Sequence, residues 1–382
     1  MKKIALITDG IWPYVLGGMQ KHSYYLCKYF AQNKIEVDLY HFNESEFDIN
    51  ELKVFTEEER KYIHSFILKF PNEKKGFGHY LKNSRSYSEL VYDAIKPSLA
   101  SYDFIYTKGF SGWKLIEEKY KGNINCCKIG VKFHGYEMFQ KAPDFKSYLQ
   151  QIFLLRKPVK QITLMADVVF SYGGKITNIL TQIGVSTEKI IEMPSGVEEN
   201  TLVEFVKPTA KIIEFVFLGR YERRKGVEEL NEALKSLDNK SAFKFHFIGP
   251  IPNDKRIIDN RIIYHGEIRE KETLNNLLRT CDVLICPSHS EGMPNVILEA
   301  MSNGLSVIAT DVGATSVLVN QNTGWLLAQS NAVLIKKSLL DVISTDSKFL
   351  DQKKTRALNL IREKFTWEQL IPQLLEKIRK VN

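Results

Sequence analysis

Near-continuous apolar runs that alternate with helical segments are the feature that most constrains how this chain can fold. The chain opens with the apolar run "KIALITD", a glycine loop and the helical segment "MQKHSYYLCKYFAQNK", and it continues with the apolar runs "EVDLYHF", "FIYTKG" and "KIGVKFHG". Strands of this kind, apolar at nearly every position, are typical of a parallel sheet that is covered on both faces. The pattern therefore predicts an α/β fold.

The same alternation starts again in the second half of the chain. It begins at "IIEFVFLGR", residues 212–220, and continues through "FKFHFIG", "RIIYHGE", "CDVLICPS" and "LSVIATD". A length of 382 residues is sufficient for two domains that each bury a core. Two consecutive arrays predict two doubly wound domains that face each other across a crevice. Residues 43–88 fit neither array clearly, and we interpret them as an insertion near a binding cleft.

The sequence argues against a membrane-spanning, a secreted and a disulfide-stabilised protein. No apolar run approaches the roughly 18 residues of a membrane span. The first apolar run ends at Thr8 and Asp9, which is too early for a signal peptide. The five cysteines are odd in number, lie in apolar surroundings and form no C-x2-C pair. We therefore expect no disulfide, no zinc site and a cytoplasmic location.

The net positive charge of the chain is concentrated in its first half. Residues 1–190 contain 27 Lys and Arg against 20 Asp and Glu, whereas residues 191–382 contain 26 against 25. Either this is an ordinary solvated surface, or the first half meets an anionic partner such as a membrane face or a phosphorylated lipid. No nucleic-acid partner is expected, because no binding motif accompanies the charge.

The stretch "SHSEGMPNVILEAMSNG", residues 288–304, is predicted to be a loop that follows a parallel strand and leads into a helix. Pro294 suits the first helical position and Gly304 suits the position after the last turn. Ligands of open α/β sheets bind at such loops, and the free N–H groups of a helix start favour phosphate.

Two glutamates flank this predicted phosphate site. Glu291 lies ahead of the helix and Glu299 lies within it, so they could accept hydrogen bonds from hydroxyl groups on either side of a diphosphate. A nucleotide sugar has this layout. Glu299 could instead be a polar residue in an apolar run, and a pair of glycosidase carboxylates is the other alternative, which the helix-start context disfavours.

Three further stretches place candidate binding groups at the same crevice. In "FLGRYERRKGVEEL", residues 217–230, Arg220 and Lys225 follow a strand and suit a diphosphate, although a solvated basic turn is the alternative, above all for Arg223 and Arg224. A glycine pair, Gly17 and Gly18, precedes a helix and allows close approach to an anion. His134 directly follows a strand in "VKFHGYEMF", although a lone histidine is more often structural. Neither G-x-G-x-x-G nor a P-loop motif occurs.

Together these stretches resemble the family-four retaining glycosyltransferases, which have the GT-B fold of two Rossmann-like domains around a central cleft. The resemblance covers essentially the whole chain and is strongest in "SHSEGMPNVILEAMSNGLSVIATDVGA". It implies that the terminal helix, which starts near "FTWEQL", returns to the first domain. The implied domains are residues 1–200 plus 366–382, which bind the acceptor, and residues 201–365, which bind the donor.

The resemblance also implies roles for individual residues. Glu291 would contact the donor sugar, Glu299 the ribose hydroxyls, Arg220 and Lys225 the diphosphate, and His134 would lie near the transferred sugar. The remaining implied donor contacts are Gly17 and Gly18 at the diphosphate, Gly266 and Glu267 in base recognition, and Gly292, Met293, Pro294 and Asn295 near the donor sugar. "PSGVEEN" departs from the family's more common N-G-V-D, since Ser195 and Glu198 replace Asn and Asp.

The implied reaction is transfer of a sugar, with retention, from a nucleoside diphosphate sugar to a glycan or lipid-linked acceptor in the synthesis of surface polysaccharide or lipopolysaccharide. No metal and no cofactor are expected, since Arg220, Lys225 and the helix start supply the positive charge. The alternatives are a nucleotide-sugar epimerase or sugar-phosphate synthase with a soluble substrate, and a binding protein without catalysis. The segment "FKSYLQQIFLLRKPVKQITL", residues 145–164, is either a peripheral contact with an anionic membrane at the inner face or an ordinary helix over the sheet.

Overall fold

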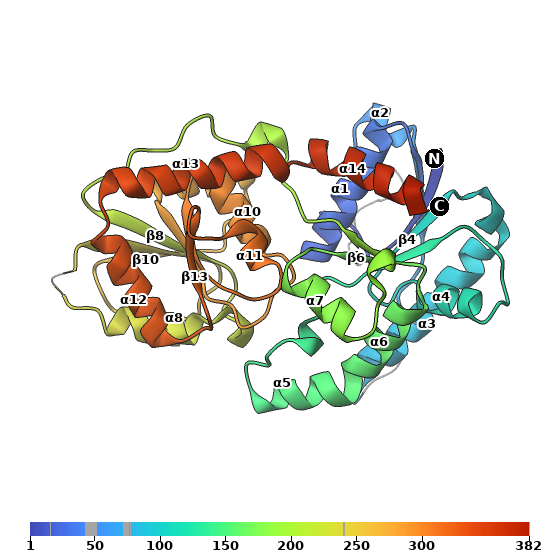
Figure 1. Cartoon of the computed structure of the whole chain (residues 1–382), viewed down its shortest axis with the longest axis horizontal. Helices are drawn as coiled ribbons and strands as arrows, with labels where there is room; N and C mark the ends of the chain where they lie inside the picture. Colours follow the sequence, from blue (N-terminus) through green and yellow to red (C-terminus); the bar gives the residue numbers. More distant parts are fainter. Residues whose placement is uncertain (16, 43–51, 72–75, 77, 240, 382) are drawn as a thin grey trace.

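Two parallel sheets form the centres of two domains in the computed structural model (Figure 1). The structure describes residues 1–15, 17–42, 52–71, 76, 78–239 and 241–381. The first sheet has seven strands in the order β3-β2-β1-β4-β5-β6-β7 and the second has six in the order β10-β9-β8-β11-β12-β13, with every neighbouring pair parallel. The predicted pair of doubly wound domains with the GT-B arrangement is confirmed.

Strand and helix alternate along the first domain as the apolar runs predict. Its strands are β1 Lys3–Ile7, β2 Glu36–His41, β3 Ile63–Ile67, β4 Phe104–Lys108, β5 Ile129–Lys132, β6 Val168–Ser171 and β7 Ile190–Glu192. Its helices are α1 Gly18–Gln32, α2 Glu57–Arg60, α3 His79–Ile95, α4 Trp113–Tyr120, α5 Phe145–Gln150, α6 Arg156–Met165 and α7 Lys175–Gln182. A π-helical segment, η3 Gln151–Leu155, joins α5 to α6. Short 3-10 turns are η1 Lys96–Ser101, η2 Glu137–Phe139, η4 Thr187–Lys189 and η5 Glu199–Thr201.

The second domain repeats the alternation. Its strands are β8 Ile213–Leu218, β9 Phe243–Ile248, β10 Ile262–Gly266, β11 Val283–Cys286, β12 Ser306–Thr310 and β13 Gly324–Leu327. Its helices are α8 Val227–Lys235, α9 Lys271–Thr280, α10 Asn295–Ser302, α11 Thr315–Leu318, α12 Ala332–Ile343 and α13 Ser347–Lys364, with 3-10 turns η6 Arg223–Lys225 and η7 Asn253–Lys255. The inner strands β8, β9, β11 and β12 are mostly buried on both faces, in the manner of a covered parallel sheet, whereas the edge strands β10 and β13 are partly exposed.

Residues 43–88 were interpreted as an insertion, and part of that interpretation is wrong. Within this range β3 pairs with β2 as the edge strand of the first sheet, and the start of α3 lies at its end. The charged and aromatic composition of the segment concealed the strand because an edge strand is only partly buried. Residues 43–51, 72–75 and 77 lie outside the described residues.

The last helix, α14 Trp367–Val381, leaves the second domain and packs beside α1 on the first (Figure 1). Thr366 forms a β-bridge with Val197, and the Trp367 backbone N–H donates to the Val197 carbonyl at 2.9 Å. The apolar face of α14 joins the same core as Tyr25 and Tyr29. The domain limits at residues 200 and 366 remain a prediction: the first lies in η5, between β7 and β8, and the second lies between α13 and α14.

Two simpler expectations concern cysteines and membrane spans. All five cysteines are free, so the prediction of no disulfide is confirmed. Among the described helices, none has the length and apolar character that a bilayer crossing requires.

Replacing Trp367 should cost stability because its side chain is fully buried. The indole stacks on Tyr25 at 5.2 Å between ring centroids and meets the His22 ring edge-on at 5.2 Å. We expect Trp367→Ala to lower the free energy of unfolding by about 3–5 kcal/mol, measured by urea titration. Trp12→Ala, the same change at a side chain that is 38% exposed, should cost clearly less. Equal losses would contradict the packing role of α14.

Candidate active site

The loop between β11 and α10, residues 287–294, lies at the carboxyl edge of the second sheet, as predicted. Asn295 is the first residue of α10, and Pro294 is the N-cap, one position earlier than the sequence suggested. Gly304 follows the C-cap with a φ of +84°, a left-handed conformation that glycine adopts without strain. The free N–H groups of the helix start therefore face the crevice end of the sheet.

Glu291 is the centre of a buried group of charges in this loop. Its carboxylate accepts hydrogen bonds from Lys225 Nζ at 2.6 Å and from Ser288 Oγ at 2.8 Å, and Arg224 Nη1 lies 3.5 Å away. The side chain is only 8% exposed. Burial acts to raise the pKa of Glu291, but Lys225 and Arg224 outweigh it and hold the pKa below its ordinary value. Glu291 is therefore an anion that can accept hydrogen bonds from hydroxyl groups.

Arg220 is not part of this group. Its side chain is 72% exposed and pairs with Glu222 at 2.9 Å. Arg224, for which a solvated turn was the sequence interpretation, instead reaches Glu291. The placement of Lys225 agrees with the prediction, and contact of Arg220 with a diphosphate stays a prediction.

Glu299 lies in the second turn of α10 and is already paired across the interface. Lys21, from α1 of the first domain, donates to Glu299 Oε1 at 2.5 Å. Burial acts to lower the pKa of Lys21, but attraction to Glu299 is larger and raises it. A ribose hydroxyl could reach Glu299 only if this ion pair opens, and sequence reasoning missed Lys21 because its partner is 278 positions away.

The first domain supplies the opposite wall of the site. A Cβ atom on Gly292 would lie 1.8 Å from the carbonyl oxygen of His134, so the two backbones touch across the interface. A Cβ atom on Gly18 would lie 2.9 Å from His134 Nε2 and 3.6 Å from Asn295 Nδ2. The structure therefore brings together four residues of the predicted site: Gly18, His134, Gly292 and Asn295. Gly17 is the N-cap of α1 and directly precedes Gly18.

His134 is held in one orientation and remains uncharged. Its Nδ1 lies 2.9 Å from the Tyr172 hydroxyl, which leaves Nε2 directed toward Gly18. Burial, aided by Lys108 and Lys132, lowers the pKa of His134 to about 3. A neutral imidazole in this position can exchange hydrogen bonds with a sugar hydroxyl without carrying charge.

Behind His134 lies a buried basic cluster that sequence reasoning missed: Lys108, Lys132 and His22. Lys108 Nζ is 2.8 Å from His22 Nδ1, and Lys132 Nζ is 3.2 Å from His22 Nε2. A neutral imidazole has one N–H donor, and an ammonium group cannot accept a hydrogen bond. The N–H of His22 therefore points at an uncharged amine, so at least one lysine is neutral. Burial lowers the pKa of Lys108 to about 7, which agrees.

The helix start is also tied to the interdomain segment. Ser195 Oγ donates to Asn295 Oδ1 at 3.0 Å, and the Ser195 backbone N–H contacts Met293 Sδ at 3.1 Å. Gln140 Nε2 donates to the Glu291 carbonyl at 2.6 Å. Ser195, which departs from the common family pattern, thus serves as a contact between the domains.

Glu198, the second departure, lies between cations of both domains. Its carboxylate contacts Lys28 of α1 at 2.5 Å and Lys271 of α9 at 3.0 Å. These ion pairs join the two domains at the interdomain segment, in addition to the contacts of Ser195.

Gly266 and Glu267 lie further along the same sheet edge. The Gly266 carbonyl accepts a hydrogen bond from the Gly249 backbone N–H at 2.7 Å, and the Gly219 backbone N–H donates to the Ile248 carbonyl at 2.9 Å. The carboxyl ends of β10, β9 and β8 therefore lie side by side. Glu267 is 53% exposed and pairs with Arg269. No contact joins either residue to the Glu291 group among the described residues, and their part in base recognition stays a prediction.

The charge balance around Glu291 makes a pH-dependent prediction. Lys225→Met removes the closest cation from a buried carboxylate, so we expect the free energy of unfolding at about pH 7 to fall by about 1–3 kcal/mol. Burial should then raise the pKa of Glu291, and protonation at about pH 5 should remove part of the loss. Urea titrations at both pH values measure this.

The double variant Lys225→Met/Glu291→Gln is the control for this measurement. It removes the unpaired charge and should recover stability at about pH 7. A loss of the same size at both pH values, or no recovery, would contradict the ion pair.

Comparisons with known proteins agree with this geometry. Residues 213–345, which include Lys225, Glu291 and Glu299, match the family model of glycosyl transferases group 1. A putative teichuronic acid biosynthesis glycosyltransferase, TuaC of Bacillus subtilis, is 33% identical over 124 residues. That alignment covers 32% of this chain, and the chain spans about a third, 31%, of the relative.

Solved structures match over the whole length. Sucrose-phosphate synthase from Thermosynechococcus elongatus has a TM-score of 0.78 at 17% identity and covers 100% of this chain and 99% of its own. HepE of Anabaena, solved in complex with UDP, has a TM-score of 0.68 at 15% identity and covers 100% of both chains. At these identities the likeness concerns the fold. The chain thus has the GT-B fold, and its residues 213–345 match the family model of glycosyl transferases group 1.

Proposed function

We propose that this protein transfers a sugar, with retention, from a nucleoside diphosphate sugar to a glycan or lipid-linked acceptor of a surface polysaccharide. The observation that carries the proposal is the pairing of Lys225 with buried Glu291 beside the start of α10, opposite Gly18 and His134 of the other domain. The family of residues 213–345 and the biosynthetic name of the Bacillus subtilis relative support it. UDP in the HepE structure supports a nucleoside diphosphate donor.

In this proposal the diphosphate occupies the start of α10. Backbone N–H groups of residues 292–295 and the Lys225 ammonium bind its oxygens, and Arg220 swings in from its exposed position. Glu291 accepts hydrogen bonds from the sugar, and Glu299 accepts them from the ribose after release of Lys21. The same cations stabilise the charge that develops on the departing phosphate, so no metal is part of the proposed reaction.

The chemical step needs no protein nucleophile. The acceptor hydroxyl oxygen forms a bond to the anomeric carbon on the face from which the phosphate leaves. The bond from that carbon to the phosphate oxygen breaks, and the departing phosphate takes the hydroxyl proton. Neutral His134, fixed by Tyr172, positions the sugar and adds no charge.

Nucleotide binding gives the first test. UDP or GDP should raise the melting temperature of the wild-type protein in thermal-shift measurements, increasingly with concentration. Lys225→Met, compared with its own ligand-free state, should lose most of that shift. Lys235→Met, an exposed lysine at the end of α8, should keep it. No shift with any nucleoside diphosphate or its sugars would refute the donor assignment.

Turnover separates the proposed enzyme from its alternatives. Release of nucleoside diphosphate that requires a glycan or lipid-linked acceptor supports transfer, and release with soluble sugar phosphates points to a synthase. Interconversion of the sugar without an acceptor points to an epimerase. Binding without turnover points to a non-catalytic protein. Activity that survives EDTA supports the metal-independent reaction.

A membrane surface is the second part of the proposal. The continuous helical segment of α5, η3 and α6 exposes Phe145 by 73% and Phe153 by 74%, beside the exposed lysines Lys146, Lys157 and Lys160. Apolar side chains with neighbouring cations are typical of peripheral contact with anionic lipid. The acceptor domain would then lie at the inner face of the membrane.

Liposome flotation tests this contact. The wild-type protein should float with vesicles that contain anionic lipid and much less with neutral vesicles. Phe145→Ser/Phe153→Ser should remain unbound, whereas Phe349→Ser, at a phenylalanine of α13 that is 47% exposed, should float like the wild type. Flotation with neither vesicle would leave α5 as an ordinary surface helix.

A further inference from the structure

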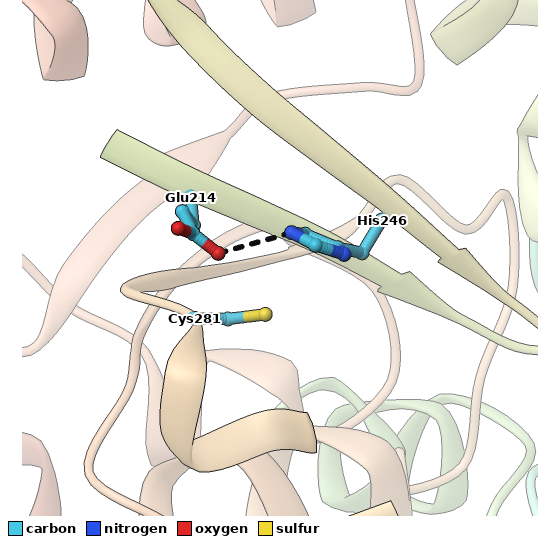
Figure 2. A group of neighbouring side chains, drawn as sticks. All are labelled: Glu214, His246 and Cys281. Atoms are coloured by element: carbon cyan, nitrogen blue, oxygen red, sulfur yellow. Dashed lines mark hydrogen bonds and ion pairs between the residues drawn. The ribbon is translucent and has the colours of Figure 1, made fainter. Parts of the chain in front are cut away.

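A second cluster of chemically reactive side chains lies in the second domain, away from the candidate active site. It contains Glu214 of β8, His246 of β9 and Cys281, which lies between α9 and β11. Figure 2 shows the carboxylate and the imidazole directed toward each other, with the thiol in the same space. One ligand atom from each residue lies within 4.8 Å of the other two. We propose that these three residues bind a zinc ion.

The residue types fit zinc. Zinc binds thiolate, imidazole and carboxylate ligands at about 2.0–2.3 Å, which places ligand atoms about 3.3–3.8 Å apart in a tetrahedron. Glu214 Oε2 and His246 Nε2 are already 3.1 Å apart. Because all three ligand atoms lie within 4.8 Å of one another, a movement of about 1 Å is enough to bring the thiol to this spacing. The three residues then occupy three corners of the tetrahedron, with water as the fourth ligand.

The charges and the access also fit. Thiolate and carboxylate together neutralise the two charges of zinc, and the imidazole binds in its neutral form. Cys281 is 1% exposed and His246 is 5% exposed, whereas the Glu214 side chain is 22% exposed, so the site opens to solvent on the carboxylate side. Lys244 lies 3.6 Å from Glu214 Oε1, the other oxygen, which leaves Oε2 for the metal.

The surroundings already orient the imidazole. His246 Nδ1 lies 2.9 Å from Nε2 of His265, on the neighbouring strand β10. If His246 Nε2 binds zinc, its Nδ1–H can donate to His265. Metal-binding histidines are typically fixed by such a hydrogen bond from the second ring nitrogen. The backbone N–H of Glu214 also donates to Asp282 Oδ2 at 3.0 Å, which fixes the start of β8 beside Cys281.

The position of the cluster points to a structural site. Glu214 is the second residue of its strand and Cys281 precedes its strand, so both lie at the amino edge of the sheet, opposite the β11–α10 loop. A bound ion would tie β8 and β9 to the end of α9. The proposal departs from the sequence prediction of no zinc site, which rested on the absence of paired cysteines. It is independent of the proposed reaction.

Cobalt is the most direct probe, because a cobalt ion bound to a thiolate gives a charge-transfer absorption band. The full-length protein, reduced and freed of metal with EDTA, should develop this band with one cobalt ion per chain, and zinc should abolish it. Cys281→Ser should remove the band, and Cys286→Ser, which removes another buried thiol of the same sheet, should retain it. Circular dichroism verifies that each variant is folded.

Two further variants test how much a neighbouring histidine and a ligand contribute to metal affinity. His265→Ala keeps all three ligands and should weaken metal affinity by about 10- to 100-fold. Glu214→Gln removes a ligand and should weaken it more. Zinc should raise the melting temperature of the wild-type protein and not that of Cys281→Ser. No band in the wild type, or a band that survives Cys281→Ser, would overturn the proposal.

Discussion

The contact between the carboxyl edges of the two parallel sheets is the constraint on which the rest of the structure depends. At that contact the backbone of Gly292 lies against the carbonyl of His134, and no side chain larger than hydrogen fits between them. Loops that follow parallel strands gather at one edge of a sheet. When two such edges face each other, groups that are far apart in the sequence come together. His134 and Gly18 thereby meet Asn295 without any local sequence relation.

Two acidic side chains at this interface are paired with lysines. Glu291 is paired with Lys225, and Glu299 with Lys21. Cations that are suited to a diphosphate would repel one another if they had no anionic neighbours, and a buried carboxylate without a cation would be costly. Each acid therefore neutralises a lysine and is a potential acceptor for hydroxyl groups. Binding of a donor would exchange partners and leave few charges unpaired.

Much of the fold could be predicted because apolar runs that are buried on both faces leave a strong pattern. The two arrays, the start of α10 near Asn295 and the stop at Gly304 follow from local rules about strands, helix starts and glycine. The edge strand β3 was missed because partial exposure gives it a mixed composition. Local rules thus succeed where burial is complete.

The candidate site was predictable at strand ends and unpredictable where contacts join distant segments. Lys225 and Glu291 each follow a strand, and their closeness follows from the topology of the sheet. Arg224 and Arg220 are four positions apart in one turn, and only the three-dimensional path of the turn decides which of them reaches Glu291. Lys108 and Lys132 end apolar strands, which was the available sign of a buried amine. Their shared partner His22 could not be inferred from spacing.

The return of α14 to the first domain also affects how the chain is made. Residues 1–192 leave the ribosome long before residues 367–381, yet their core around Tyr25 and Tyr29 is completed only by Trp367 and the apolar face of α14. Domains generally fold in the order of synthesis. Here the earlier domain must wait, with an apolar surface uncovered, until the later one has emerged. Its final packing therefore follows the synthesis of the second domain, and chaperones can bind the uncovered surface until then.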